Sequence, residues 1–68
     1  MDELYAHNRI RGFAVLTEKF NYDGDYMFQS TLMYNGTVMH TTKMRLSYEN
    51  CLRDAELYIA EYWKEDDL

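Results

Sequence analysis

The stretch that decides the fold is the last one, Ser47 to Leu68, with the sequence SYENCLRDAELYIAEYWKEDDL. At about 100° per residue its apolar side chains gather on one arc, which is typical of a helix lying on a core. This arc consists of Tyr48, Cys51, Leu52, Ala55, Tyr58, Ile59, Tyr62 and Trp63. Ser47 precedes it and is a favourable N-cap, because its hydroxyl can accept a hydrogen bond from a free backbone N–H of the first turn. We therefore expect an amphipathic helix.

The net charge of −5 is concentrated in this same stretch. Seven acids and two bases lie in residues 47–68, whereas residues 1–46 carry five acids and five bases and are neutral. The acids are Glu49, Asp54, Glu56, Glu61, Glu65, Asp66 and Asp67. An acidic excess disfavours direct binding to nucleic acid or to an anionic membrane, because phosphate contacts need Lys and Arg. A complementary partner would be basic.

The residues before the helix favour strands joined by tight turns. Residues 10–20, 25–34 and 37–46 are rich in β-formers, and Asp23-Gly24 and Asn35-Gly36 between them are typical two-residue hairpin turns. We interpret residues 1–9 as an arm or a marginal helical turn. The sequence thus predicts one α+β domain over residues 1–68. It contains a three-stranded antiparallel meander over residues 10–46, then a helix and acidic tail over residues 47–68, in the order β-β-β-α.

Two-residue turns fix which strand residues share a face, because Tyr22 then opposes Asp25 and Tyr34 opposes Thr37. One helix can cover only one face of the sheet, which leaves the other face exposed in a monomer. We favour packing of the helix on the side of Gly12 and Ala14, where small residues leave room for Tyr62 and Trp63, although the opposite assignment stays open. The uncovered face would then hold a dimer patch of Phe13, Val15, Leu32 and Tyr34.

A second subunit is also the expected source of added stability. A domain of 68 residues builds a small core and usually needs a disulfide, a metal or a partner chain. Cys51 is the single cysteine and, with His7 and His40, makes no zinc-ligand set. A homodimer is therefore the expected form.

Residue types and spacings typical of catalysis are missing from the sequence. It contains no Ser/His/Asp order, no metal-ligand spacing and no Gly-rich phosphate loop, so we expect no enzyme, no catalytic residue, no metal and no cofactor. Cys51 falls on the apolar arc and is expected to be a buried structural residue. No signal region or long apolar run is present, which favours a soluble cytoplasmic protein.

The acids along one edge of the helix are the most distinctive pattern. Asp54, Glu61 and Glu65 are spaced by about 10 Å and then about 6 Å at 1.5 Å per residue, a scale comparable to that of backbone phosphates. Asp66 and Asp67 extend the row, and Glu49, Glu56 and Leu57 are possible additional contacts. A helix of this kind can present carboxylates where a DNA-binding protein expects phosphates. The simpler interpretation is a solvated helix face that keeps a small protein in solution.

In size, charge layout and element order, the chain resembles the small acidic inhibitor proteins that phages make against host factors. Several of those proteins mimic DNA with carboxylates on a sheet-plus-helix fold. The resemblance implies a dimer in the host cytoplasm that occupies the DNA-binding surface of a basic protein, such as a nucleoid-associated protein. The alternative is a structural or adapter homodimer that binds a protein partner through an apolar patch on the sheet or around Leu57.

Overall fold

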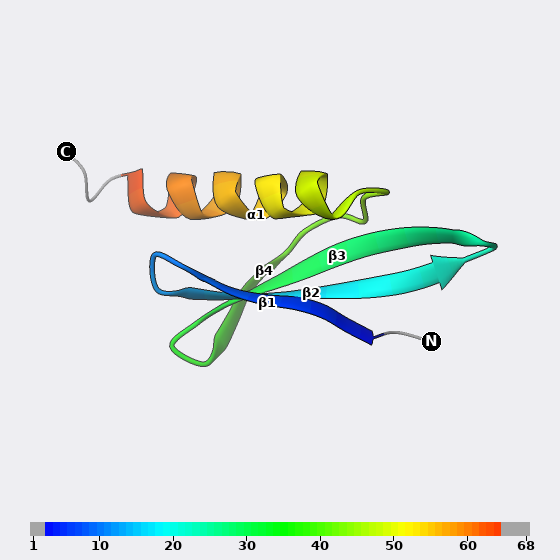
Figure 1. Ribbon diagram of the computed structural model, residues 1–68. Coiled ribbons are helices and arrows are strands. Elements are labelled where there is room, and N and C mark those ends of the chain that lie inside the picture. Colours follow the sequence, from blue (N-terminus) through cyan, green and yellow to red (C-terminus); the bar gives the residue numbers. More distant parts are fainter. Residues whose placement is uncertain (1–2, 65–68) are drawn as a thin grey trace.

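The computed structural model describes residues 3–64 and shows an antiparallel sheet with one helix across it (Figure 1). The sheet is a meander in the order β1-β2-β3-β4, and α1 follows the last strand. The elements are β1 Glu3–Ile10, β2 Phe13–Tyr22, β3 Asp25–Tyr34, β4 Thr37–Thr41 and α1 Tyr48–Trp63. The predicted α+β class with a C-terminal helix is confirmed, but the sheet has four strands instead of three.

The additional strand is β1, in the segment that we had expected to be an arm. It pairs with β2 from Glu3 to Ile10, and the two strands are joined by a tight turn at Arg11-Gly12. Both turn residues have positive φ, 49° and 91°, the combination required by the favoured two-residue hairpin turn. The prediction was wrong because it placed Gly12 inside a strand. In addition, Arg11 occupies the first turn position, where Asp or Asn would have indicated a hairpin turn.

The other two turns confirm the predicted registers. Tyr22 pairs with Asp25 around Asp23-Gly24, and Tyr34 pairs with Thr37 around Asn35-Gly36. The last strand is shorter than the expected range 37–46, since the observed β4 ends at Thr41. A shift in register between Leu32 and Met33 interrupts the pairing of β3 with β4. The chain then stays in contact with β3 outside the strand ladder, since the Thr42 N–H donates to the Ser30 carbonyl oxygen at 2.9 Å and Arg45 forms a bridge with Phe28.

The helix begins where the sequence indicated. Ser47 has an extended backbone, and its side chain accepts a hydrogen bond from the backbone N–H of Asn50 at 3.1 Å. Cys51, Ala55 and Ile59, one helical turn apart from each other, are the buried residues of α1. Burial of the apolar arc therefore supplies most of the stability of this helix, as is usual for a helix in a small domain.

α1 covers the opposite sheet face from the one that we favoured. Phe13, Val15 and Leu32 are fully buried and form the core with Ala55 and Ile59. Tyr34 packs against the edge of this core, together with Tyr58 and Trp63. The predicted dimer patch is therefore wrong, since three of its residues have no exposed surface. The physical reason is that the larger apolar side chains gain more free energy by burial than Ala14 does, while Gly12 belongs to a turn.

The sheet is longer than the helix that covers it. The Cα atoms extend over 46 × 21 × 14 Å, and the end of the β2–β3 hairpin projects past the first turn of α1 (Figure 1). β1 and β4 flank only the middle and the other end of this hairpin, because they pair with residues 13–19 and 31–34, respectively. The uncovered sheet face and the projecting hairpin are thus the largest features that α1 leaves open.

Candidate binding surfaces

The outward face of α1 holds Glu61 of the predicted acidic row and the three residues predicted as possible additional contacts. Glu49, Glu56 and Glu61 are all exposed there. Leu57 lies among them with 62% of its surface exposed. The two bases on this face are Arg53 and Lys64, which are also exposed. The outward face therefore combines an accessible leucine with separated carboxylates and is not uniformly acidic.

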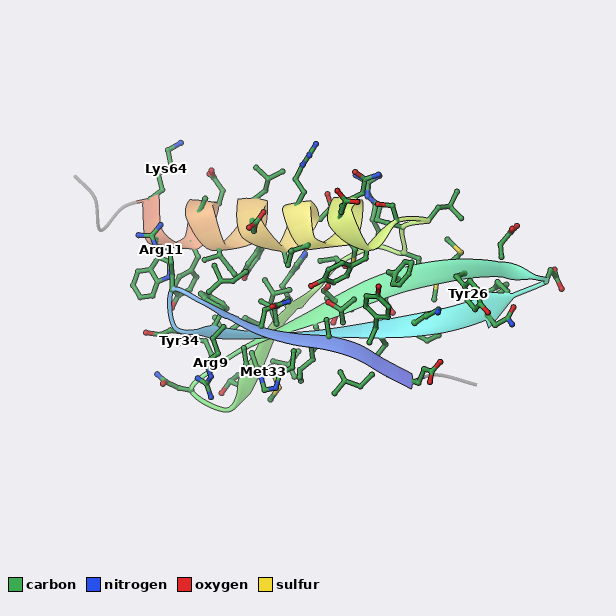
Figure 2. All side chains as sticks on the ribbon, in the orientation of Figure 1. Arg9, Arg11, Tyr26, Met33, Tyr34 and Lys64 are labelled. Carbon is green, nitrogen blue, oxygen red and sulfur yellow. The ribbon has the colours of Figure 1, made fainter. Side chains whose placement is uncertain are left out.

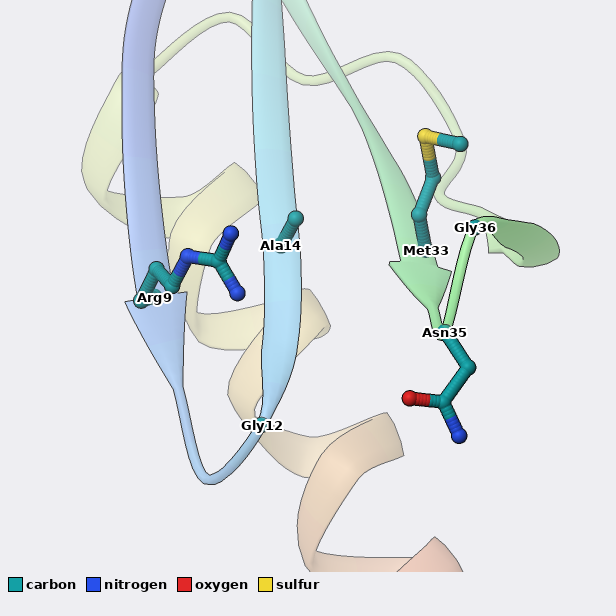
Figure 3. Close-up of a pocket in the computed structure, with 6 residues that line it drawn as sticks. All are labelled: Arg9, Gly12, Ala14, Met33, Asn35 and Gly36. Atoms are coloured by element: carbon teal, nitrogen blue, oxygen red, sulfur yellow. The ribbon is translucent and has the colours of Figure 1, made fainter.

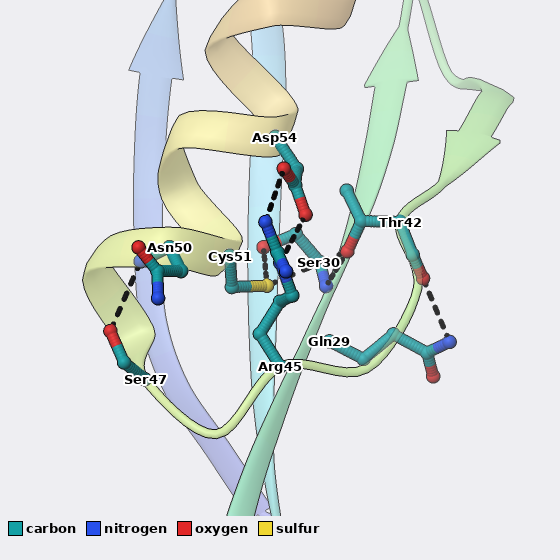
Figure 4. Close-up of polar contacts among 8 residues, drawn as sticks. All are labelled: Gln29, Ser30, Thr42, Arg45, Ser47, Asn50, Cys51 and Asp54. Carbon is teal, nitrogen blue, oxygen red and sulfur yellow. Dashed lines mark hydrogen bonds and ion pairs between the residues drawn. The ribbon is translucent and has the colours of Figure 1, made fainter.

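Asp54 is placed differently from the other acids of the predicted row. Its carboxylate accepts two hydrogen bonds from Arg45, from Nε at 2.7 Å and from Nη2 at 3.2 Å (Figure 4). The two side chains are 21% and 36% exposed, respectively. This paired geometry is the strongest that arginine and a carboxylate form. The main contact of Asp54 therefore connects the segment before α1 to the second turn of the helix. The charge of Asp54 is largely balanced by Arg45.

The remaining acids of the row follow the last described residue of the chain. Glu65, Asp66 and Asp67 fall outside the described residues 3–64. Within residues 48–64 there are four acids and two bases, a net charge of −2, so residues 65–67 carry the other −3 of the acidic stretch. Glu61, whose side chain is 75% exposed, approaches Lys64 at 4.0 Å. This separation, with both groups in solvent, contributes little to stability.

The uncovered face of the sheet is the second candidate surface. Ala14, Leu16 and Phe20 of β2 lie on it, since they alternate with the buried residues of that strand. The apolar side chains of this face are Leu4, Ala14, Leu16, Phe20, Met27, Met33 and Val38, of which Leu4 and Val38 are 61% and 56% exposed. Arg9 and Glu18 are charged residues on this face, since Arg9 pairs with Ala14 and Glu18 follows the buried Thr17. Sequence reasoning missed Arg9 because its strand was not recognised.

A pocket of about 310 Å³ opens on this uncovered face, between the hairpin turns (Figure 3). Its lining residues are Arg9, Gly12, Ala14, Met33, Asn35 and Gly36. Figure 3 shows the Arg9 side chain reaching from β1 toward Ala14 on β2. The hollow exists because glycine and alanine occupy positions where the neighbouring rows carry larger side chains.

A buried polar cluster lies between the sheet and the first turn of α1. The thiol of Cys51 is 3.1 Å from the Ser30 hydroxyl and 3.5 Å from that of Thr42 (Figure 4). Ser30 also shares a hydrogen bond with Thr17 at 2.7 Å, and its backbone N–H donates to Thr42 Oγ1 at 3.0 Å. Cys51 has no exposed surface, which confirms its predicted burial. The cluster is therefore part of the core.

An aromatic and basic group gathers near the projecting hairpin. Lys19 Nζ lies 4.0 Å from the ring centre of Tyr26 and 5.7 Å from that of Tyr5. Tyr5 also contacts Tyr48 of α1, with ring centres 5.1 Å apart. A cation over an aromatic ring is a common structural contact. Here it connects the first strand to the long hairpin.

Comparisons with known proteins add no relative. No protein-family model, curated protein or solved structure matches the chain. Within residues 3–64 there is no helix of the length and hydropathy needed to cross a membrane. The same part of the chain brings together no group of three or more His, Cys, Asp or Glu side chains that could hold a metal ion.

Proposed function

We propose that this protein is a non-enzymatic, acidic binding protein that inhibits a basic DNA-binding protein, such as a nucleoid-associated protein, by presenting DNA-like carboxylates. The observation that supports the proposal is the set of exposed acids on α1, namely Glu49, Glu56 and Glu61. In sequence, Glu65, Asp66 and Asp67 continue this acidic stretch. The proposed site differs from the sequence-based one in two respects. Asp54 has a structural partner and contributes little to it. Glu49 and Glu56, expected as possible additional contacts, are instead main members of the site.

The physical basis of the inhibition is competition for the same basic residues. A DNA-binding surface attracts phosphates through Lys and Arg, and free carboxylates on a rigid helix bind these groups in the same way. Such contacts steer association at long range and weaken as salt increases. Leu57 provides an apolar contact in the middle of the acids, which adds affinity that salt does not remove.

The test is displacement of duplex DNA from a purified nucleoid-associated protein, followed by fluorescence anisotropy of a labelled duplex. The wild-type chain is expected to release the duplex at low salt and to lose this effect at high salt. Two triple variants remove three charges each: Glu49→Gln with Glu56→Gln and Glu61→Gln, or Glu65→Gln with Asp66→Asn and Asp67→Asn. Each is expected to weaken displacement by about tenfold or more, since several charge-assisted contacts are lost.

The matched control removes the same net charge from the sheet. Glu3→Gln with Asp23→Asn and Asp25→Asn lies in β1 and at the β2–β3 turn, where asparagine tolerates the positive φ of residue 23. Asp54 is kept in every variant, because its loss would also break the pair with Arg45. If the control weakens displacement as much as the helix variants do, only the total charge matters and the proposed site is wrong.

A second candidate function is favoured by the uncovered sheet face. This function is that of a structural or adapter homodimer that binds a protein partner through an apolar patch. The supporting observation is the exposure of Leu4 and Val38 on a face that also carries Leu16 and Phe20. It predicts partner binding that is insensitive to salt and lost on Leu16→Asp, whereas the acidic binding protein should tolerate this change.

A further inference from the structure

The two ends of the uncovered sheet face, taken along the direction of the strands, carry side chains of different size. At one end Ala14 pairs with Met33 beside the pocket. At the other end Phe20 pairs with Met27 on the projecting hairpin. Figure 2 shows Arg9 and Met33 on the side of the sheet turned away from α1. A small residue with a hollow thus lies at one end of this face, and a large aromatic residue lies at the other.

A two-fold axis would bring these two ends together. Ala14 and Phe20 are six residues apart on the same face of β2, about 20 Å at 3.3 Å per residue. A two-fold axis that runs across the strands, midway between them, places the Phe20 end of one copy over the Ala14 end of the other. The contact is then made twice, as in any interface formed by the same patch on both subunits.

The pocket is large enough for the side chain that would enter it. Cavities of about 150 Å³ in other proteins hold a benzene ring, and this pocket measures about 310 Å³. Its walls combine the small residues Gly12 and Ala14 with the apolar Met33. Phe20 is partly exposed on the same face, so its ring gains further burial by entering the hollow of a second copy.

The charges on the face suit the same arrangement. Among residues 3–64, neither Arg9 nor Glu18 forms an ion pair within its own chain. In the two-fold pair, Glu18 of the second copy lies over Leu16, which is one residue row from Ala14 and Arg9. At a sheet separation of about 10 Å, two long side chains can close this distance. The two arginines stay about 20 Å apart, because the axis sends each to the opposite end.

The width of the face fits a weak contact. β2 and β3 each carry four rows of outward residues, β1 carries three and β4 two. At about 4.8 Å between strands these rows cover roughly 400 Å², so two copies would bury on the order of 800 Å² in total. That value lies below the range of standard specific interfaces and fits a weak, reversible dimer. We propose that a second copy of the chain packs face to face on this surface, with Phe20 of each copy in the pocket of the other and Arg9 paired with Glu18 across the contact. The proposal rests on the second candidate function and takes a second copy of the chain as the partner that the uncovered face binds.

Charge reversal tests the proposed pairing directly. The oligomeric state of the full chain is measured by sedimentation velocity over a concentration series, and circular dichroism checks that each variant is folded. We expect a reversible dimer for the wild type and a dimerisation constant at least about tenfold weaker for Arg9→Glu or Glu18→Arg alone. The double variant, with the charges exchanged, should recover most of the lost affinity. Leu57→Asp, on the far side of α1, is the control and should dimerise like the wild type.

The pocket is tested by a second pair of variants. Ala14→Glu fills the hollow with a charged side chain, and Phe20→Ala removes the group that enters it. Both should weaken dimerisation without unfolding the chain, since neither residue is in the buried core. A wild type that stays monomeric over the whole concentration series would overturn the proposal. Single charge reversals that dimerise as well as the wild type would overturn the pairing of Arg9 with Glu18.

The result also separates the dimer from the adapter function. A monomeric wild type that still captures a protein partner, with the capture lost on Leu16→Asp, would overturn the dimer while supporting the adapter. A dimer that displaces DNA in the assay above supports the dimer together with the acidic function.

Discussion

Arg45 and Asp54 connect the segment after β4 to the second turn of α1 through two parallel hydrogen bonds, the shorter of them 2.7 Å. The same Arg45 exchanges backbone hydrogen bonds with Phe28 of β3, at 2.7 and 2.8 Å. One residue thus joins the sheet, the connecting segment and the helix.

Loss of this pair should lower stability by a modest amount. Asp54→Asn keeps the size of the side chain but removes its charge, and both groups retain contact with solvent. We expect the free energy of unfolding to fall by about 1 kcal/mol or less, measured by urea unfolding followed by circular dichroism. Glu61→Gln at the exposed 4.0 Å pair with Lys64 is the control. Equal losses for the two variants would contradict a special role of the Arg45 pair.

Thr42→Val should be more costly, although it preserves the shape of the side chain. Thr42 Oγ1 accepts the hydrogen bond of the buried Ser30 N–H, and valine leaves this donor without a partner. An unsatisfied buried group costs about 1–3 kcal/mol. Thr42→Ser retains the hydroxyl and should lose less. The comparison is made by thermal unfolding, and a valine variant as stable as the serine variant would show that the hydrogen bond contributes nothing.

The attachment of β4 to the helix depends on Tyr58. Its ring lies parallel to that of His40, with centres 4.3 Å apart and an angle of 5°, and its hydroxyl donates to the Met39 carbonyl oxygen at 3.4 Å. All five residues of β4 are exposed, so few other contacts hold this edge strand. Tyr58→Ala should speed amide hydrogen exchange in residues 37–41 more than in β2 and β3. Tyr58→Phe, which keeps the ring, should behave nearly like the wild type.

The turn glycines should differ in their tolerance of alanine. Gly36 has φ of +78° and nothing within 4 Å of an added Cβ, so Gly36→Ala loses only the backbone preference, about 1–2 kcal/mol. At Gly12, with φ of +91°, the same Cβ would lie 3.1 Å from the Tyr34 ring. Gly12→Ala is therefore expected to lose more stability in urea unfolding. The reverse order would mean that the Tyr34 ring moves away without cost.

The sequence predicted the local features of this fold well. Asn35-Gly36 and Asp23-Gly24 specified their turns, since these residues adopt positive φ at little cost. Ser47 indicated the start of the helix, since its hydroxyl can accept a hydrogen bond from the first turn. The turn at Arg11-Gly12 was missed because arginine carries no such preference. Without this turn, β1 and the position of Arg9 on the sheet could not be predicted.

Features that depend on distant parts of the chain could not be read in this way. Periodicity placed Asp54 on the helix edge, but it could not reveal that Arg45 would neutralise it. Strand alternation likewise defined two sheet faces without deciding which of them α1 covers. That choice depends on the total area buried by side chains such as Phe13 and Leu32, a property of the assembled layers.

The position of Trp63 gives the chain an internal reporter of helix docking. Every strand pairs with its neighbour in the chain through a two-residue turn, so the hairpins can form locally, on a scale of about 1–10 μs. The Trp63 indole instead donates to the Arg11 carbonyl oxygen, across 52 residues, and this contact connects α1 to the first hairpin turn. Trp63 is the only tryptophan of the protein. Tryptophan fluorescence should therefore report the docking of the helix and not the pairing of the strands.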